Sequence, residues 1–294
     1  MTRFIILVVA LLFALPESTN AQELSYGFRV GLNVSTFLGD EEMDAGGTSL
    51  ESFSTNTGFH VGGGVRIEFT ELFGIRTEIL FTQKGTKRTF SGDSFLLFNG
   101  PNGKIFTTGN RSIALNISNA YLEIPVLAYG KIGDKFEVFG GVYAGFLVSS
   151  IATGELIYTG GVVEGNNNII PTLEIALDYN YLRDTPGERI NGVEDIPVMV
   201  GNENVVIPNT LSAYYDLDEK NGSPYNILDA GVSAGAAYFM NGGLYISAIA
   251  NYGLVDVSNE DMDFSNAEIN GLDFVTRDDR DSNLSFQFSV GFSF

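Results

Sequence analysis

The chain has 294 residues, among them 35 glycines, 23 phenylalanines and 13 tyrosines, and it contains no cysteine and no tryptophan. The lack of cysteine excludes disulfides, thiolate nucleophiles, cysteine-based metal sites and a lipid attached to an N-terminal cysteine. The formal net charge of −20 argues against nucleic-acid binding, because that function needs a basic surface.

The first residues have the layout of a secretory signal peptide. Arg3 precedes an apolar run over residues 4–15, and small residues follow at 19–21. The apolar run is shorter than the roughly 20 residues that a membrane-spanning helix needs. We therefore predict a signal peptide over residues 1–21, cleaved after Ala21, and a mature protein over residues 22–294.

Eight later segments alternate apolar and polar residues with the period of two that is typical of β-strands. In the last segment every second residue is leucine, phenylalanine or valine, and the segment ends on Phe294. A strand of this kind is typical of the terminal strand of an outer-membrane β-barrel. The predicted strands cover residues 24–35, 58–69, 72–84, 120–129, 136–148, 228–239, 244–254 and 283–294.

The apolar faces of these segments carry no charged residue. This is expected of a face that meets lipid, where Lys or Arg costs roughly 2–4 kcal/mol at mid-membrane. Short turns alternate with long connections, and aromatic residues near the strand ends, Phe37 and Phe59 among them, suit girdles at the membrane interfaces. We predict an all-β fold, an eight-stranded antiparallel up-and-down transmembrane β-barrel with long extracellular loops, located in the cell outer membrane.

The longest predicted extracellular loop covers residues 150–226. Inside it, residues 173–181 and 211–217 again alternate apolar and polar positions. They predict either an extracellular hairpin that extends the barrel wall or two further membrane strands, which would make ten. We favour the hairpin, because Glu and Asp are frequent in this region and structureless loops of such length are uncommon.

Several segments together resemble the outer-membrane β-barrel family common in Bacteroidetes, whose members include PorT-like proteins. The segments are GFRVGLNVS at 27–35, GFHVGGGV at 58–65, EILFTQKG at 78–85, YLEIPVLAYG at 121–130, FGGVYAGFLVS at 139–149 and SFQFSVGFSF at 285–294. YLEIPVL is the most specific of them. The resemblance implies an eight-stranded outer-membrane barrel. PorT-like members are associated with type IX protein secretion, but a fold does not fix a function.

The inward faces of the predicted strands carry charges of both signs. An eight-stranded barrel has an interior just wide enough for side chains to fill, and buried charges need partners. We interpret the charges as a structural network that plugs the lumen; the alternative is a narrow ion or proton path. The predicted network consists of Arg29, Arg66, Glu68, Arg76, Glu78, Glu123 and Glu137.

The predicted loops are acidic, apart from the second, which carries Lys87, Arg88, Lys104 and Arg111. Acidic loops keep a surface soluble, and they also suit divalent cations or a basic partner. The stretch DLDEKNG at 216–222 has a lysine where a calcium loop needs an oxygen ligand, so it is a poor calcium site. We expect neither a metal nor another cofactor.

These features favour a structural or interaction protein, accessory to type IX-like secretion or envelope assembly. The alternative is a narrow porin-like channel for small solutes or cations. A rim hydrolase built on His60, the only histidine, is a minor alternative without a nucleophile motif, so we expect no enzyme. Expected partners are outer-membrane lipid, secretion or envelope proteins, and the barrel-assembly machinery, through the strand ending at Phe294.

Overall fold

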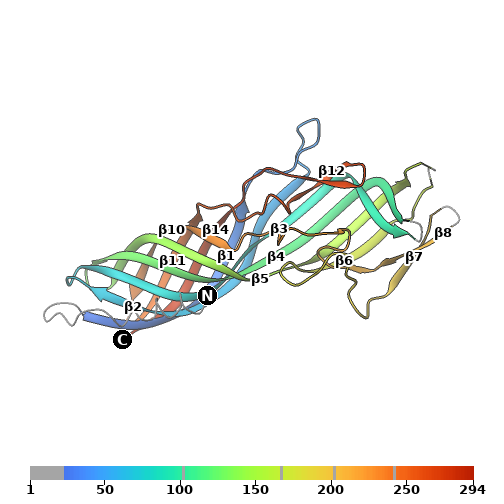
Figure 1. Ribbon diagram of the computed structural model, residues 1–294. Coiled ribbons are helices and arrows are strands. Elements are labelled where there is room, and N and C mark those ends of the chain that lie inside the picture. The colour runs from blue at the N-terminus through green and yellow to red at the C-terminus, as the bar shows by residue number, and fades with distance from the viewer. Residues whose placement is uncertain (1–22, 101–102, 166–167, 201–202, 241–242) are drawn as a thin grey trace.

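The structure is a computed structural model that describes residues 23–100, 103–165, 168–200, 203–240 and 243–294, so the predicted signal peptide lies outside the described residues. All its regular elements are strands, and eight of them form a closed ring (Figure 1). In order of pairing the ring contains β1 (Glu23–Leu38), β2 (Glu51–Glu68), β3 (Phe73–Gly100), β4 (Gly103–Ile132), β5 (Phe136–Val163), β10 (Leu228–Phe239), β11 (Leu244–Gly253) and β14 (Ser282–Ser293). Among the described residues, no helix has the length and apolar character to span a membrane.

Neighbouring strands of the ring are antiparallel throughout. β14 closes the ring by pairing with β1, where Val30 faces Val290. β10 pairs with β5, where Val232 faces Val142, and this pair bypasses the whole segment between them. Closure leaves the wall without a free edge, so the backbone groups of the ring find their partners inside the wall.

The alternation in the sequence becomes two chemically opposite faces of the ring. Leu32 and Val142 point outward and are 67% and 57% exposed, whereas Asn33 and Gln287 point inward and are buried. The outward apolar positions of the eight strands form a continuous belt, which we call the apolar band. Such a belt matches the lipid-facing surface of a membrane barrel.

The predicted strand cores all lie in the ring, but five of the strands, β1 to β5, are longer than predicted. β2 begins at Glu51, and β3, β4 and β5 contain 28, 30 and 28 residues. The prediction that the second loop covers residues 85–119 is wrong for most of this stretch. There β3 and β4 stay paired from Gly85 opposite Ser118 to Gly100 opposite Gly103.

The long strands continue beyond the apolar band with the polarity of their faces exchanged. Here Phe90, Leu115 and Ile117 are buried on the inner face, while Lys87 and Asn116 are exposed on the outer face. An inner apolar face with an outer polar face is the pattern of a sheet in water. The same strands therefore leave the apolar band and form a second, water-facing wall.

This wall is one part of a region that we call the extension. It consists of residues 51–57 of β2, 85–100 of β3, 103–119 of β4 and 149–163 of β5, and of the short strands with the segments that join them (Figure 1). The short strands are β6 (Leu173–Asn180), β7 (Asp195–Val200), β8 (Glu203–Pro208), β9 (Thr210–Leu211), β12 (Phe264–Asn270) and β13 (Asp273–Thr276).

The predicted loop over residues 150–226 thus contains regular structure. Residues 173–180 form β6, which pairs with β5 from Leu173 opposite Tyr158 to Asn180 opposite Ile151. The stretch 211–217 contributes only β9, which lies parallel to β6. These two segments do not form a hairpin with each other. Neither enters the ring, because β10 pairs directly with β5.

The extension has its own apolar core. Leu156, Ile175 and Val205 are among its fully buried side chains, and the core reaches Tyr121 at the mouth of the ring. Phe37 was expected at the lipid-facing girdle, and this expectation is wrong. Phe37 is buried and packs against Tyr225, with ring centroids 5.8 Å apart.

Candidate functional site

The first charge cluster lies in the ring near the short turns. Arg66 and Arg76 both pair with Glu137, and the Arg76 Nη1 to Glu137 Oε1 distance is 3.3 Å. The guanidinium of Arg66 lies 4.3 Å from the Tyr129 ring centroid, and that of Arg76 lies 3.6 Å from the Phe139 centroid. Aromatic faces stabilise these cations in addition to the shared carboxylate.

The second cluster lies farther along the interior and centres on Arg29. Its Nε donates to Glu78 Oε2 at 2.6 Å, and its Nη1 donates to Gln287 at 3.0 Å and to Ser289 at 3.1 Å. The imidazole of His60 completes the cluster. A Cβ on Gly31 would clash with the Phe288 carbonyl oxygen and would lie 2.7 Å from the imidazole Cε1, so the neighbouring strand and this ring both require glycine there.

The third cluster lies at the end of the ring that meets the extension. Lys84 Nζ is 2.5 Å from Glu123 and 2.9 Å from Asp229. It also lies 4.1 Å from the ring centroid of Tyr143, whose hydroxyl donates to Asp229 at 3.3 Å. One buried ammonium thus serves two buried carboxylates, so its positive charge holds this part of the interior together.

The predicted network residues are all found in ion pairs. Six of them fall into the three buried clusters, whereas Glu68 lies at the turn end, in a half-exposed pair with Lys131 at 2.8 Å. Lys84 and Asp229 were not among the predicted residues. The alternation of apolar and polar residues in its strand places Lys84 on the inward face, and this is the sequence signal that could have identified it. Its pairing with Asp229 crosses the ring from β3 to β10.

His60 was expected near the outer rim, and this expectation is wrong. Its Nδ1 is 2.6 Å from Asn33 Oδ1 and its Nε2 is 2.7 Å from Ser289 Oγ. A serine, a histidine and an amide are thus in contact, as in hydrolase active sites. However, His60 is 0% exposed and Ser289 5%, so a substrate has no approach to this serine.

No described residue closes the turn end of the ring interior. A hollow of about 730 Å³ lies there, bordered by Arg66, Lys131, Glu137 and Phe239. The Arg66–Glu137 pair of the first cluster forms its floor, and the other two clusters lie beyond it. The hollow is therefore a vestibule that ends at the first charge cluster.

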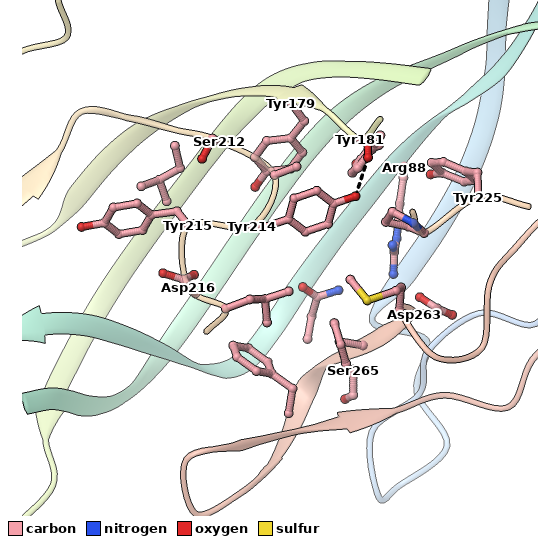
Figure 2. A pocket seen from close by; sticks show the side chains of 18 of the residues that line it. Arg88, Tyr179, Tyr181, Ser212, Tyr214, Tyr215, Asp216, Tyr225, Asp263 and Ser265 are labelled. Carbon is pink, nitrogen blue, oxygen red and sulfur yellow. Dashed lines mark hydrogen bonds between the residues drawn. The ribbon is translucent and has the colours of Figure 1, made fainter. Parts of the chain in front are cut away.

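A separate cavity of about 170 Å³ lies in the extension (Figure 2). Arg88 of β3, Arg111 of β4 and Tyr179 of β6 line one side. The segments 211–217 and 262–266 line the other side and bring Asp216 and Asp263 to it. Side chains from both the predicted basic loop and the predicted acidic loops therefore meet around one space.

Ionic contacts fix the basic side of this cavity. Glu51 accepts from Arg88 and, at 2.9 Å, from Arg277 Nη1. Burial opposes ionisation of Glu51, but the two guanidinium groups outweigh burial and hold its pKa below the usual range. Arg111 has no ion pair among the described residues, and its Nε is buried without a hydrogen-bond partner there.

Nearby cations offset only part of the cost of burying the carboxyl groups of the cavity. Burial raises the pKa of Asp216 to about 6, and Arg111 and Lys104 offset this only in part. Burial also raises the pKa of Asp263 to about 7, with a contribution from its hydrogen bond to Asp279. Lys220 donates to the Asp184 carbonyl and Asp218 pairs with Lys104. The stretch 216–222 is thus held by an ion pair and a hydrogen bond, and no cluster suited to a metal is found among the described residues.

Comparisons with known proteins identify one family. A family model described as "Outer membrane protein beta-barrel domain" matches residues 20–259. None of the curated protein sequences matches the chain significantly.

The solved structures that the chain matches include outer-membrane proteins. The outer membrane protein OprG from Pseudomonas aeruginosa is 9% identical, with a TM-score of 0.35, over 94% of this chain and 98% of that chain. Neisserial surface protein A is 9% identical, with a TM-score of 0.26, over 93% and 98%. The outer membrane protease OmpT from Escherichia coli is 9% identical, with a TM-score of 0.29, over 96% and 99%.

Proposed function

Since the chain belongs to the outer membrane protein beta-barrel domain family and is located in the outer membrane, we propose that it is a barrel with a closed lumen and a structural or interaction role. In this proposal the apolar band faces lipid and the short turns face the periplasm. The extension then projects from the cell surface, because long connections of such barrels lie outside.

The filling of the ring interior is the observation that supports a closed lumen. The clusters around Glu137, Arg29 and Lys84 follow one another along the interior, with their charged groups buried in ion pairs. Beyond them, Tyr121 and Leu147 belong to the apolar core of the extension. A permeating ion would have to separate buried ion pairs and then cross an apolar layer, and both steps cost several kcal/mol.

An accessory role in type IX-like secretion or envelope assembly is the interaction that we propose. It is supported by the resemblance of segments such as YLEIPVL to PorT-like proteins, and by an ordered extension that offers a broad surface. We further propose that the barrel-assembly machinery recognises β14, which ends beside Phe294. The outward residues Phe286, Phe288 and Val290 of this strand are about half exposed, as recognition of its apolar face requires.

Crosslinking in intact cells tests this role. The protein is then purified from native outer membranes in mild detergent, and its partners are identified by mass spectrometry. We expect stoichiometric recovery of secretion or envelope-assembly subunits, crosslinked through the extension or the short turns. An unrelated barrel of similar abundance serves as the control. Recovery of the barrel alone, with the same background as the control, would contradict the accessory role.

A narrow channel is the second candidate, and the vestibule of about 730 Å³ favours it. This hollow would give small solutes access to the charged interior from the turn end. The channel requires the Arg66–Glu137 and Lys84–Asp229 pairs to move aside together. Conductance in lipid separates the two candidates.

A further inference from the structure

The cavity in the extension is not explained by a closed lumen, because it lies outside the ring and keeps its own set of polar groups. We propose that this cavity binds one neutral sugar residue, either free or at the end of a glycan. Its lining combines aromatic faces, hydrogen-bond donors and hydrogen-bond acceptors around a small volume, which is the chemistry that a sugar ring requires.

The aromatic part of the lining consists mainly of five tyrosines, from the end of β6, from segment 211–217 and from the chain just before β10 (Figure 2). They are Tyr179, Tyr181, Tyr214, Tyr215 and Tyr225. Tyr181 packs edge-on against Tyr179 and Tyr225, with ring centroids 5.7 Å and 5.3 Å apart. The Tyr214 hydroxyl donates to the Tyr181 carbonyl at 2.7 Å and fixes the neighbouring ring. Fixed aromatic rings offer apolar faces on which the C–H face of a sugar can pack, at a low cost in entropy.

The polar part of the lining presents donors beside acceptors. Arg111 Nε and Arg88 Nη2 are buried donors without a hydrogen-bond partner among the described residues. Asp216 and Asp263 bring carboxyl groups to the same cavity. A sugar hydroxyl donates one hydrogen bond and accepts others, so neighbouring hydroxyls can satisfy a guanidinium and a carboxyl at once.

Charge balance favours a neutral ligand. The charged side chains of the lining are two arginines, Arg88 and Arg111, and two aspartates, Asp216 and Asp263. A ligand with a net charge would meet repulsion from one pair while it gained from the other. A neutral polyhydroxylated ligand meets no such repulsion.

The size of the cavity limits the ligand to one ring. Its volume of about 170 Å³ is below the roughly 300–1,000 Å³ of pockets that enclose drug-sized molecules. Arg111 and Asp216 are only partly buried, so the rest of a glycan can extend from the bound residue toward solvent. The proposed site does not depend on the lumen, so it and the closed-lumen proposal can fail separately.

Ligand-detected NMR on the full chain in detergent tests the proposal. The probes are a panel of neutral monosaccharides, with sorbitol as an open-chain polyol and glucuronate as a charged sugar. We expect saturable binding of at least one neutral sugar with a Kd of roughly 1 mM, a weak affinity typical of small ligands. Sorbitol and glucuronate are expected to bind at least about tenfold more weakly, because one lacks the ring and the other is charged.

Two variants connect binding to this cavity. Arg111→Gln and Asp216→Asn each remove a charged hydrogen-bonding group, so each should weaken sugar binding by about tenfold or more. Lys87→Gln and Asp178→Asn make the same charge changes at exposed positions of β3 and β6 and should leave binding unchanged. If Arg111→Gln does not fold, Asp216→Asn carries the comparison.

The binding results either identify the source of the sugar or overturn the proposed site. Tighter binding of oligosaccharides released from the producing cell's own surface glycan would identify that glycan as the ligand source; tighter binding of panel sugars would identify an external source. Absence of saturable binding to either set at roughly 50 mM, far above the expected Kd, would overturn the proposal. So would a preference for glucuronate, or equal binding in the cavity variants and their controls.

Discussion

At the scale of single residues, the interior depends on charges that cannot lose their partners. Lys84 is the clearest case, because it is 2% exposed and serves both Glu123 and Asp229. The Lys131–Glu68 pair has the same chemistry but is about one-quarter to one-third exposed. The difference in burial between these two lysines predicts very different costs for the same substitution.

Lys84→Met should destabilise the protein by roughly 3–5 kcal/mol, because it leaves two buried carboxylates without a counter-ion. Lys131→Met, the matched control, should cost at most about 1 kcal/mol, since water screens its half-exposed pair. Urea unfolding of the protein refolded into detergent or lipid measures both. Equal free energies of unfolding for the two variants would contradict the charge network.

The aspartates of the extension predict a dependence of stability on pH. Burial raises the pKa of Asp263 and of Asp281 to about 7, from an ordinary value of 3.8, and the neighbouring Asp279 adds to the shift. The folded state therefore binds more protons than the unfolded state between about pH 4 and pH 7, so stability falls as pH rises through this window. Arg88 and Arg277 limit this effect, because both face these aspartates.

Thermal melting followed by the near-ultraviolet circular dichroism of tyrosine measures this effect. The extension should melt at a higher temperature at pH 5 than at pH 8, by roughly 2–4 °C for each kcal/mol lost. Glu51 has a lowered pKa, so it changes stability only around and below its ordinary value of 4.5 and has little effect on the comparison of pH 5 with pH 8. The double variant Asp263→Asn/Asp281→Asn should reduce the dependence to the part that comes from Asp216, whose pKa is raised to about 6, whereas Asp178→Asn should not change it. Higher melting temperatures at pH 8 would show the sign to be wrong.

At the scale of strands, β5 passes through two environments. Val142 lies on its outward face in the apolar band and is 57% exposed. Thr153 lies on the outward face of the same strand in the extension, opposite Asn116 of β4. In the proposed arrangement the first position faces lipid and the second faces water, so one strand provides both the test and its control.

Val142→Arg should prevent normal assembly, because Arg at mid-membrane costs roughly 2–4 kcal/mol. Thr153→Arg places the same side chain in water and should assemble like the unchanged protein. The amount of folded protein in isolated outer membranes measures both. Normal recovery of Val142→Arg would show that this position does not face lipid and would contradict the placement of the apolar band.

The ring strands could be predicted from sequence because their alternation is regular and their outward face is free of charge. The extension was missed over residues 85–119 because its apolar residues, such as Phe90 and Ile117, point inward and its outward face is polar. A polar outward face does not fit a lipid-facing strand, so the sequence pattern of this stretch predicts a loop instead. The alternation also placed Arg29 and Glu78 on the inward face. They stand on β1 and β3, which are separated by β2.

Partners across the ring could not be predicted in the same way. The Lys84–Asp229 pair joins β3 to β10, and these strands have no sequence signal that brings them together. The cavity in the extension was equally out of reach, because Arg111 and Asp216 come from connections that were expected to be separate loops. Only the closure of the ring and the folding of the extension place these side chains together.

At the scale of the whole molecule, the ring and the extension have separate tasks in this account. The ring anchors the chain in the outer membrane and is filled by ion pairs. The extension continues four of its strands into water and holds an apolar core with a polar, tyrosine-lined cavity. A partner or a glycan outside the cell would meet the extension, while the ring would pass nothing.

Single-channel recording in planar lipid bilayers tests this closed lumen most directly. A general porin reconstituted by the same procedure confirms that insertion produces measurable currents. The account predicts no steady conductance for this protein after insertion has been verified, because the clusters around Glu137, Arg29 and Lys84 block the interior and the core around Tyr121 covers it. A steady conductance that scales with salt concentration would contradict the closed lumen and favour the narrow channel.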